Sequence, residues 1–295
     1  MPLNSPTNNP KTLDKYGTLY VVATPIGNRD DITLRALKTL ENVEVIAAED
    51  TRHTGSFLKN HPVKGKLISY HEHNEKERTP DLIERLKAGF SVALVSNAGT
   101  PVLSDPGFRL IKTAIECNIK VTPIPGVSAA IAALSVSGLP CDAFAFIGFP
   151  AKKRGKRLKQ LEALAAVPWT LIFYESPKRI AKLLEDILSV MGDRQAVVSR
   201  EMTKLHEEFI RGFLSEILIR LQQHPKIKGE CTLLVKGYEA RIDISPEDLE
   251  AELLRALENR KTALPDLAKK ISKKYSLPKS EVYKQAVKIK DNHKG

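Results

Sequence analysis

Alternation of short apolar runs with helical patterns, from Gly17 to about Thr122, is the feature that most constrains this chain. The runs are TLYVVA, VEVIAA, KLIS, SVALVS and IKVT. Such alternation is typical of an α/β domain with a largely parallel sheet. In open sheets of this kind, ligands bind beyond the carboxyl ends of the strands, so the turns that follow the runs are the first candidates for a site.

A second set of apolar runs begins at Asp142 and comprises AFAFI, WTLIFY, QAVVS, EEFI and CTLLVKG, with helices expected near 156–165, 177–190 and 213–223. EEFI and CTLLVKG lie close together without a long crossover, which predicts a mixed sheet with antiparallel edges. The sequence therefore predicts two α/β domains in series.

Several helix starts carry recognisable signals. Asp105-Pro106 and Ser176-Pro177 each place a capping side chain before a proline, a combination that favours the first helical turn. Asn74 and Glu77 have the spacing of a capping box. We expect helices to begin at these positions.

Beyond Tyr238 only helical patterns remain, the first starting at Ser245-Pro246. Residues 259–295 contain eleven Lys or Arg against three acidic residues, so they carry most of the formal net charge of +11. Two short helices with a turn at Tyr275 to Pro278 predict a helix-turn-helix module. The charge favours a polyanionic partner, although an enzyme that is merely basic also fits.

These patterns predict four segments: a disordered leader (1–16), an N-terminal α/β domain (17–125), a C-terminal α/β domain (126–240) and a basic helical module (241–295). The leader has neither the apolar core nor the basic start of a signal peptide. Val121 to Cys141 is uncharged over a membrane-length span, but prolines and Gly126 interrupt it, which favours a buried loop and helix. The three separated cysteines indicate reduced thiols and a cytoplasmic location.

Two common phosphate-binding motifs are absent from the sequence. No G-x-G-x-x-G follows the first apolar run, which argues against a Rossmann dinucleotide site. GFPAKKRGKR has the wrong glycine spacing for a Walker motif and has Arg157 where Ser or Thr is required. We interpret this segment as a basic loop that contacts RNA through Lys152, Lys153, Arg154, Lys156 and Arg157; a solvated surface is the alternative.

Three turns rich in small residues follow apolar runs: TPIGN at 24–28, SNAGTP at 96–101 and PGVSA at 125–129. Small residues let backbone N–H and C=O groups approach a ligand closely. Taken singly each turn is unremarkable, but together they predict one binding site.

Five motifs in the same order make a specific resemblance: GTLYVVATPIGNRDD, AEDTRHT, SNAGTPVLSDPG, PIPGVSAAIAALSVSGLP and LIFYESPKRI. The chain resembles the small-subunit ribosomal RNA methyltransferases of the tetrapyrrole methylase superfamily from about Gly17 to Gly237. The resemblance implies two α/β domains with S-adenosylmethionine in the cleft between them, and a homodimer. It also implies methylation of a cytidine 2'-hydroxyl in the decoding region of small-subunit ribosomal RNA.

Carried over to matching positions, the resemblance implies that S-adenosylmethionine contacts Pro25, Gly27, Ala98, Gly99, Thr100, Leu103, Ser128, Ala129, Tyr174 and Thr232. There is one departure, because Asn97 stands where the family commonly has Asp. We expect Asn97 to act as a neutral hydrogen-bonding group and not as a base.

A ribose hydroxyl is a weak nucleophile, so a general base is a reasonable expectation. Asp50, after the second apolar run, is the first candidate and Glu175 the second; Asp50 pairing with Arg52 or capping the next helix is an equal alternative. Catalysis by alignment without a base is a third possibility.

Residues expected to contact RNA are cationic or polar groups in the same motifs. Arg and Lys dominate contacts to phosphate, and the set is Arg52, His73, Asn74, Lys153, Arg154, Lys178 and Arg179. A metal cluster at His71, Glu72, His73 and Glu75 is disfavoured, because consecutive loop residues rarely close a coordination sphere.

Two other functions fit parts of the sequence. A tetrapyrrole methyltransferase shares the cofactor cleft, but the basic terminal module argues against it. A non-catalytic RNA-binding ribosome assembly factor is the alternative outside enzymes.

Overall fold

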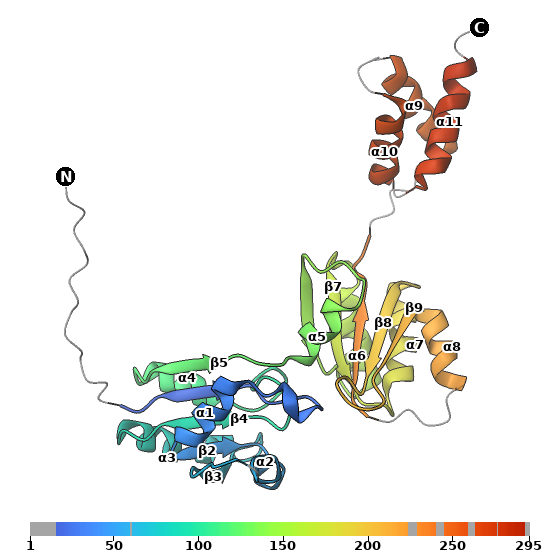
Figure 1. The fold of residues 1–295 in the computed structure, drawn as a ribbon. Helices are drawn as coiled ribbons and strands as arrows, with labels where there is room; N and C mark the ends of the chain where they lie inside the picture. Colours follow the sequence, from blue (N-terminus) through green and yellow to red (C-terminus); the bar gives the residue numbers. More distant parts are fainter. Residues whose placement is uncertain are drawn as a thin grey trace, which may run out of the picture. The chain divides into compact units, whose positions relative to one another are not determined.

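The computed structural model describes residues 16–59, 61–223, 229–239, 245–258, 263–275 and 277–292. The predicted leader, apart from Tyr16, lies outside these ranges. The chain forms two compact units, Met1–Gly237 and Tyr238–Gly295. The first unit holds two five-stranded sheets and the second holds helices (Figure 1).

The first sheet is parallel throughout, as predicted. Its strands lie in the order β3-β2-β4-β1-β5 and are β1 (Leu19–Val22), β2 (Val45–Ala48), β3 (Lys66–Ser69), β4 (Val92–Val95) and β5 (Val121–Ile124). Four helices and a short 3-10 turn connect them: η1 (Arg29–Asp31), α1 (Leu34–Asn42), α2 (Thr51–Leu58), α3 (Glu75–Lys87) and α4 (Phe108–Glu116).

Alternate residues of these strands pack on opposite faces. Leu19, Val45 and Leu94 pack with side chains of α3 and α4. Ile46 and Val95 pack on the other face with side chains of α1 and α2. Because both faces are covered, β2 and β4 are buried along their whole length, which explains their uninterrupted apolar sequences.

The second sheet is mixed, with the order β6-β7-β10-β8-β9. Its strands are β6 (Phe144–Gly148), β7 (Thr170–Glu175), β8 (Gln195–Arg200), β9 (Glu208–Phe213) and β10 (Cys231–Val235). The mixed character is confirmed, but the reasoning from proximity was wrong. β9 and β10 do not pair; β10 lies between β7 and β8, and the β6 edge is parallel. Helix α8 separates β9 from β10 and allows the chain to return to the centre of the sheet.

Helix α5 (Ala129–Ser135) covers one face of this sheet, and the opposite face packs against α6 (Arg154–Leu164), α7 (Ile180–Met191) and α8 (Leu214–Gln223). The uncharged segment 121–141 contains a strand, a loop and α5. The helix is buried on one face as expected, but the loop is exposed at Pro125 and Gly126. Ile26, from the turn after β1, joins the core formed by α5 and the second sheet. The two sheet lobes consequently share a hydrophobic cluster.

Two of the predicted helix starts need correction, and a third is right in position but lacks the expected capping bond. α4 begins at Phe108 after Gly107 and not at Asp105-Pro106, and α7 begins at Ile180, after a turn that follows Ser176-Pro177. Asn74 precedes α3, but its side chain makes no capping bond. Its amide instead accepts from the His71 N–H at 2.8 Å and donates to the Ser69 carbonyl at 3.1 Å, so it fixes the preceding loop.

The second unit is a three-helix cluster of α9 (Pro246–Glu258), α10 (Leu264–Tyr275) and α11 (Lys279–Asn292). Leu249 and Leu253 of α9 pack with Ile271 and Val282, whereas Tyr283 is exposed. Its lysines therefore lie on helices held by an apolar core. No helix within the described ranges is long and apolar enough to cross a membrane.

Arg157, predicted to contact RNA, is buried in the second lobe. Its Nε donates to Asp186 Oδ2 at 2.8 Å, and Asp186 is itself buried. Arg154 donates to the other carboxylate oxygen at 3.0 Å but remains 72% exposed. Arg157 thus joins α6 to α7 and cannot reach a phosphate.

Replacing Arg157 by Met should lower the free energy of unfolding by about 3–5 kcal/mol, because the Asp186 carboxylate is left buried with only partial compensation. The matched variant Arg154→Met should cost less than about 1 kcal/mol, as is usual for an exposed ion pair. Urea denaturation followed by circular dichroism compares the two. Equal losses would contradict the distinction between a buried and an exposed partner.

Candidate functional site

The carboxyl ends of the first sheet are tied together by hydrogen bonds between their turns. Thr24 and Gly99 exchange two backbone bonds of 2.8 and 2.9 Å. Glu49 accepts from the Asn97 N–H at 3.1 Å, and the Thr100 hydroxyl donates to the Val127 carbonyl at 3.0 Å. The turns after β1, β2, β4 and β5 therefore form one connected rim.

The loop from Asn97 to Gly107 has an unusual backbone. Gly99 and Gly107 have positive φ, and so do Val102 (77°) and Ser104 (71°). A β-branched residue in this region is strained. Such strain persists only where surrounding contacts hold the backbone, and here the Thr24, Glu49 and Val127 bonds do so.

One cavity of about 380 Å³, which we call the Tyr174 cavity, opens between this loop and the second sheet. It gathers eight of the ten predicted cofactor residues: Ala98, Gly99, Thr100, Leu103, Ser128, Ala129, Tyr174 and Thr232. They come from the turns after β4 and β5 and from the adjacent strands β7 and β10. Its volume is in the range of small-molecule sites.

Tyr174 fixes the wall of this cavity. The Ala130 N–H donates to its hydroxyl at 3.1 Å, and the rings of Phe146 and Phe149 lie 4.9 and 5.7 Å from its ring. Burial raises the pKa of the Tyr174 hydroxyl, so it stays protonated at neutral pH. An aromatic wall with one polar tip suits a flat heteroaromatic ligand.

Carboxyl groups face the same cavity. Glu49, Asp105, Glu175 and Glu230 line it, and none of its described lining residues is Lys or Arg. Burial, followed by the nearby Glu49, raises the pKa of Asp105 to about 7. The cavity therefore favours a positively charged ligand.

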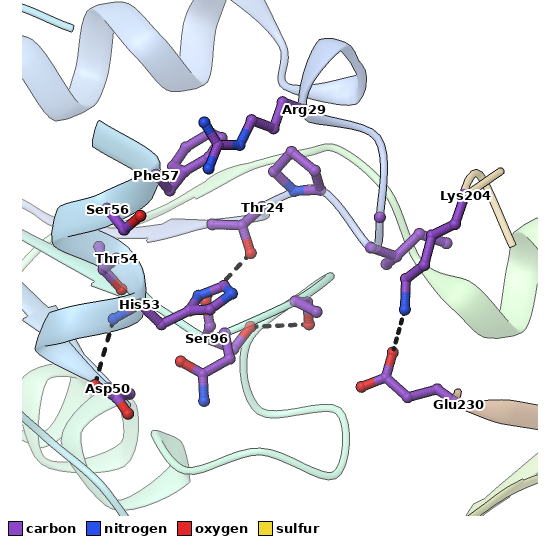
Figure 2. A pocket seen from close by; sticks show the side chains of 15 residues that line it. Thr24, Arg29, Asp50, His53, Thr54, Ser56, Phe57, Ser96, Lys204 and Glu230 are labelled. Atoms are coloured by element: carbon purple, nitrogen blue, oxygen red, sulfur yellow. Dashed lines mark hydrogen bonds and ion pairs between the residues drawn. The ribbon is translucent and has the colours of Figure 1, made fainter. Parts of the chain in front are cut away.

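A second cavity of about 480 Å³, the Phe57 cavity, adjoins the first. Pro25 and Gly27, the remaining predicted cofactor residues, line it together with Asp50. Figure 2 shows side chains of α2 along one side and the Lys204–Glu230 pair on the other. Ile26, Asn97, Ala98 and Glu230 line both cavities, so these four residues form a shared wall.

Gly27 of the first lobe lies against residues 202–204 of the second lobe. A Cβ at this position would meet Lys204 Cγ at 2.6 Å and Thr203 Oγ1 at 2.7 Å. The next N–H, from Asn28, donates to the Thr203 hydroxyl at 2.9 Å. The absent side chain is thus explained by packing against the β8–β9 turn.

Asp50 caps helix α2 and pairs with its neighbour. Its carboxylate accepts from the Arg52 N–H at 2.8 Å, the His53 N–H at 3.4 Å and the Arg52 guanidinium at 3.2 Å. The bond from the Arg52 side chain, with the two backbone bonds, lowers the pKa of Asp50 to about 2. Asp50 therefore caps α2 and pairs with Arg52, which was the alternative to a role as general base. A carboxylate of such low pKa is a weak proton acceptor.

Glu175 ends β7 and is buried, with 3% of its surface exposed. It accepts from the Ser176 N–H at 2.7 Å and from Arg179 Nε at 2.8 Å. Arg179 therefore holds a buried carboxylate in the wall of the Tyr174 cavity, which restricts its reach toward a phosphate.

The other residues predicted to bind RNA line neither cavity. Arg52 is 91% exposed, Lys178 and Lys153 are exposed, and His73 and Asn74 precede α3. No group of three or more potential metal ligands occurs within the described part of the chain. The roles of these residues remain predictions.

Sequence reasoning missed Asp105, which appeared only as a helix cap, and the residues of the Phe57 cavity, chiefly Arg29, His53 and Phe57. Asp105 stands in the SDPG motif, but nothing in the sequence shows that Glu49 and Glu230 face it. His53 and Phe57 follow the AEDTR motif with α-helical spacing, a signal that could have indicated a common helix face.

Comparison with known proteins identifies the class. Residues 18–218 match the model of the Tetrapyrrole (Corrin/Porphyrin) Methylases. Solved structures with the same fold include a cobalt precorrin-4 methyltransferase (TM-score 0.58, 18% identity, covering 78% of this chain and 98% of that one). A uroporphyrin-III C-methyltransferase from Thermus thermophilus, complexed with S-adenosyl homocysteine, gives 0.54 and 20% identity over 74% and 97%. The chain belongs to the tetrapyrrole methylase family.

Curated relatives narrow the class to one branch of methyltransferases. Ribosomal RNA small subunit methyltransferase I of Streptococcus pyogenes serotype M1 is 46% identical, over 91% of this chain and 94% of the relative. The protein of the same name from Escherichia coli O157:H7 is 44% identical, over 93% and 96%. Within the family, this chain groups with the proteins called ribosomal RNA small subunit methyltransferase I.

The raised pKa of Asp105 predicts a pH-dependent stability. The folded carboxyl has a pKa of about 7, against an ordinary value of 3.8, so it holds its proton to higher pH than the unfolded one. Its relative stabilising effect is complete below about pH 4 and is lost as pH rises through 7. Between pH 5 and pH 8 the unmodified chain loses this stabilisation, whereas Asp105→Asn does not titrate at this position. The difference in unfolding free energy, variant minus unmodified chain, should therefore rise by about 1–2 kcal/mol over this range.

Thermal denaturation at both pH values, with the exposed Asp142→Asn as control, measures this difference. A change that is the same at pH 5 and pH 8 would show that Asp105 ionises normally in the folded chain.

Proposed function

We propose that the chain transfers a methyl group from S-adenosylmethionine to the 2'-hydroxyl of a cytidine ribose in the decoding region of small-subunit ribosomal RNA. The observation that carries the proposal is the Tyr174 cavity, where eight predicted cofactor residues meet. The names of the relatives supply the class of RNA.

The Tyr174 cavity fits the proposed cofactor in shape and charge. Asn97 Oδ1 is buried there without a hydrogen-bond partner among the described residues, so it is available to accept from a ligand N–H. The turn Ala98-Gly99-Thr100 and residues Ser128 and Ala129 would hold the cofactor, with Tyr174 beside them. The carboxyl groups of Glu49, Asp105 and Glu230 suit its positive charges.

When bound, S-adenosylmethionine supplies a methyl group already activated by the sulfonium. The main task of the protein is then alignment and exclusion of water, which together contribute up to roughly 7–11 kcal/mol in favourable cases. The connected rim and strained loop support this, because they hold the cavity wall in one conformation.

Removal of the ribose proton is the remaining chemical step. Asp50 and Glu175 stay candidate bases, but the pKa of Asp50 is lowered to about 2, and hydrogen bonds from the Ser176 N–H and Arg179 restrict the movement of Glu175. Asp105 is a further candidate proton acceptor. A carboxyl with a pKa of about 7 is partly ionised at neutral pH and is still basic enough to accept a proton.

The helical unit, with its lysines, is proposed to bind RNA phosphates. Arg52, His73, Asn74, Lys153, Arg154 and Lys178 are proposed to add contacts around the cavities, and Arg179 to contribute while holding Glu175. A homodimer and a cytoplasmic location complete the proposal. A tetrapyrrole substrate is the alternative, since structural neighbours carry that name, but they are under 25% identical.

The direct test is transfer of a labelled methyl from S-adenosylmethionine to small ribosomal subunits that lack the modification. Label should appear in 2'-O-methylcytidine, or its base-modified derivative, after nucleoside analysis. Cofactor binding without transfer would favour an assembly factor, and label only on a tetrapyrrole would favour the metabolic enzyme.

Deleting residues 241–295 should weaken RNA binding and flatten its salt dependence. If the helices make about four contacts to single-stranded phosphates, the slope of log K against log salt should lose roughly 2.8. Filter binding at several salt concentrations measures the slope, and unchanged cofactor affinity is the control for folding. An unchanged slope would refute the assignment of this unit.

A further inference from the structure

We propose that the Phe57 cavity is the subsite for a single nucleotide extruded from the RNA, with its base against Phe57 and its phosphate toward Arg29. This rests on the proposed function, and it assigns roles to Arg29 and Phe57, for which the sequence analysis predicted none. The two cavities then have separate occupants that meet at the wall they share.

Adjacency is the first argument. Ile26, Asn97, Ala98 and Glu230 line both cavities. A methyl donor in one cavity and an acceptor oxygen in the other meet at this wall and nowhere else along the two linings. Methyl transfer needs reacting atoms about 3–3.5 Å apart, which adjoining cavities allow.

The different character of the two linings assigns the occupants. The Tyr174 cavity has carboxyl groups and no described Lys or Arg, so it suits the cationic cofactor. The Phe57 cavity contains Arg29, His53 and Lys204 beside two carboxylates, Asp50 and Glu230, which pair with Arg52 and Lys204. Arg29 is exposed, and Lys204 pairs with Glu201 at 2.9 Å and with Glu230 at 3.8 Å. Guanidinium and imidazole donors suit a phosphate-bearing ligand.

The aromatic side chain indicates a base. Phe57 is half-buried on α2, next to the polar side chains of His53, Thr54 and Ser56, and all four line the cavity (Figure 2). Unstacked RNA bases are bound by stacking on aromatic rings and by hydrogen bonds to their edges. Thr54 and Ser56 hydroxyls can both donate and accept, as the edge of a pyrimidine requires.

The size of the cavity is consistent with one nucleotide. At about 480 Å³ it can hold a single nucleotide but not a stretch of duplex. A nucleotide bound there would be separated from its stacked neighbours, as bases of single-stranded RNA loops are when proteins bind them. The remaining RNA would lie outside, where Arg52 and Lys178 are exposed.

Cytidine 5'-monophosphate is the probe for this subsite. Its binding to the full chain saturated with S-adenosyl homocysteine can be followed by saturation-transfer NMR of the base protons. We expect Phe57→Leu, which keeps an apolar side chain but removes the ring, to weaken binding about 10-fold or more. Phe90→Leu is the matched control, since Phe90 is exposed and lines neither cavity, and should change nucleotide affinity less than twofold.

Arg29→Gln tests the orientation of the nucleotide. Cytidine 5'-monophosphate should bind the unmodified chain more tightly than cytidine, and this preference should disappear in the variant. Loss of base-proton signals for both ligands would instead overturn the assignment of Arg29 to phosphate.

Three results would overturn the subsite: no binding of the probe, equal binding by Phe57→Leu, or binding of the probe only when S-adenosyl homocysteine is absent. Its failure is distinguishable from failure of the proposed function. If the chain methylates ribosomal subunits but nucleotide binding does not depend on Phe57, the proposed function stands and the subsite is wrong. If nucleotide binding depends on Phe57 but no methyl transfer occurs, the subsite stands and the proposed function is wrong.

Discussion

The hydrogen bonds that join four strand ends of the first sheet are the constraint on which the site depends. Each strand supplies a turn, but the turns become a cavity wall only because Glu49 binds the Asn97 N–H, Thr24 pairs with Gly99, and Thr100 reaches Val127. Most of these bonds involve backbone atoms, so they depend on parallel register more than on side-chain identity. The network fixes the start of the loop at Asn97, Gly99 and Thr100, and the strained Val102 that follows packs against the core of the first lobe.

The second lobe supplies the opposite wall of the Tyr174 cavity. Tyr174 on β7 and Thr232 on β10 are paired across the strands, and they face the rim from the opposite side of the Tyr174 cavity. Ile26 packs into the core of the second lobe. The site therefore lies within one compact unit, although its residues come from two sheets.

Much of the fold was predictable from sequence because buried parallel strands leave long apolar runs, and their carboxyl ends meet at one edge by geometry. The gathering of Ala98, Ser128 and Tyr174 around one cavity was predictable for the same reason, once the motifs were matched to a family. The place of β10 was not, because apolar pattern does not specify which strand lies at the centre of a sheet. Arg157 and Asp105 were misread because their partners, Asp186, Glu49 and Glu230, are distant along the chain.

Gly27 has a consequence for the energetics of ligand binding. Its backbone meets the β8–β9 turn with no room for a side chain, and the Asn28 N–H binds Thr203 across the same contact. The spacing between the lobes is thus set by atoms of the chain itself, before any ligand arrives. A ligand that enters such a cleft therefore spends little of its binding energy on bringing the lobes together. Even a single added methyl group at position 27 would act as a spacer that widens the gap between the lobes.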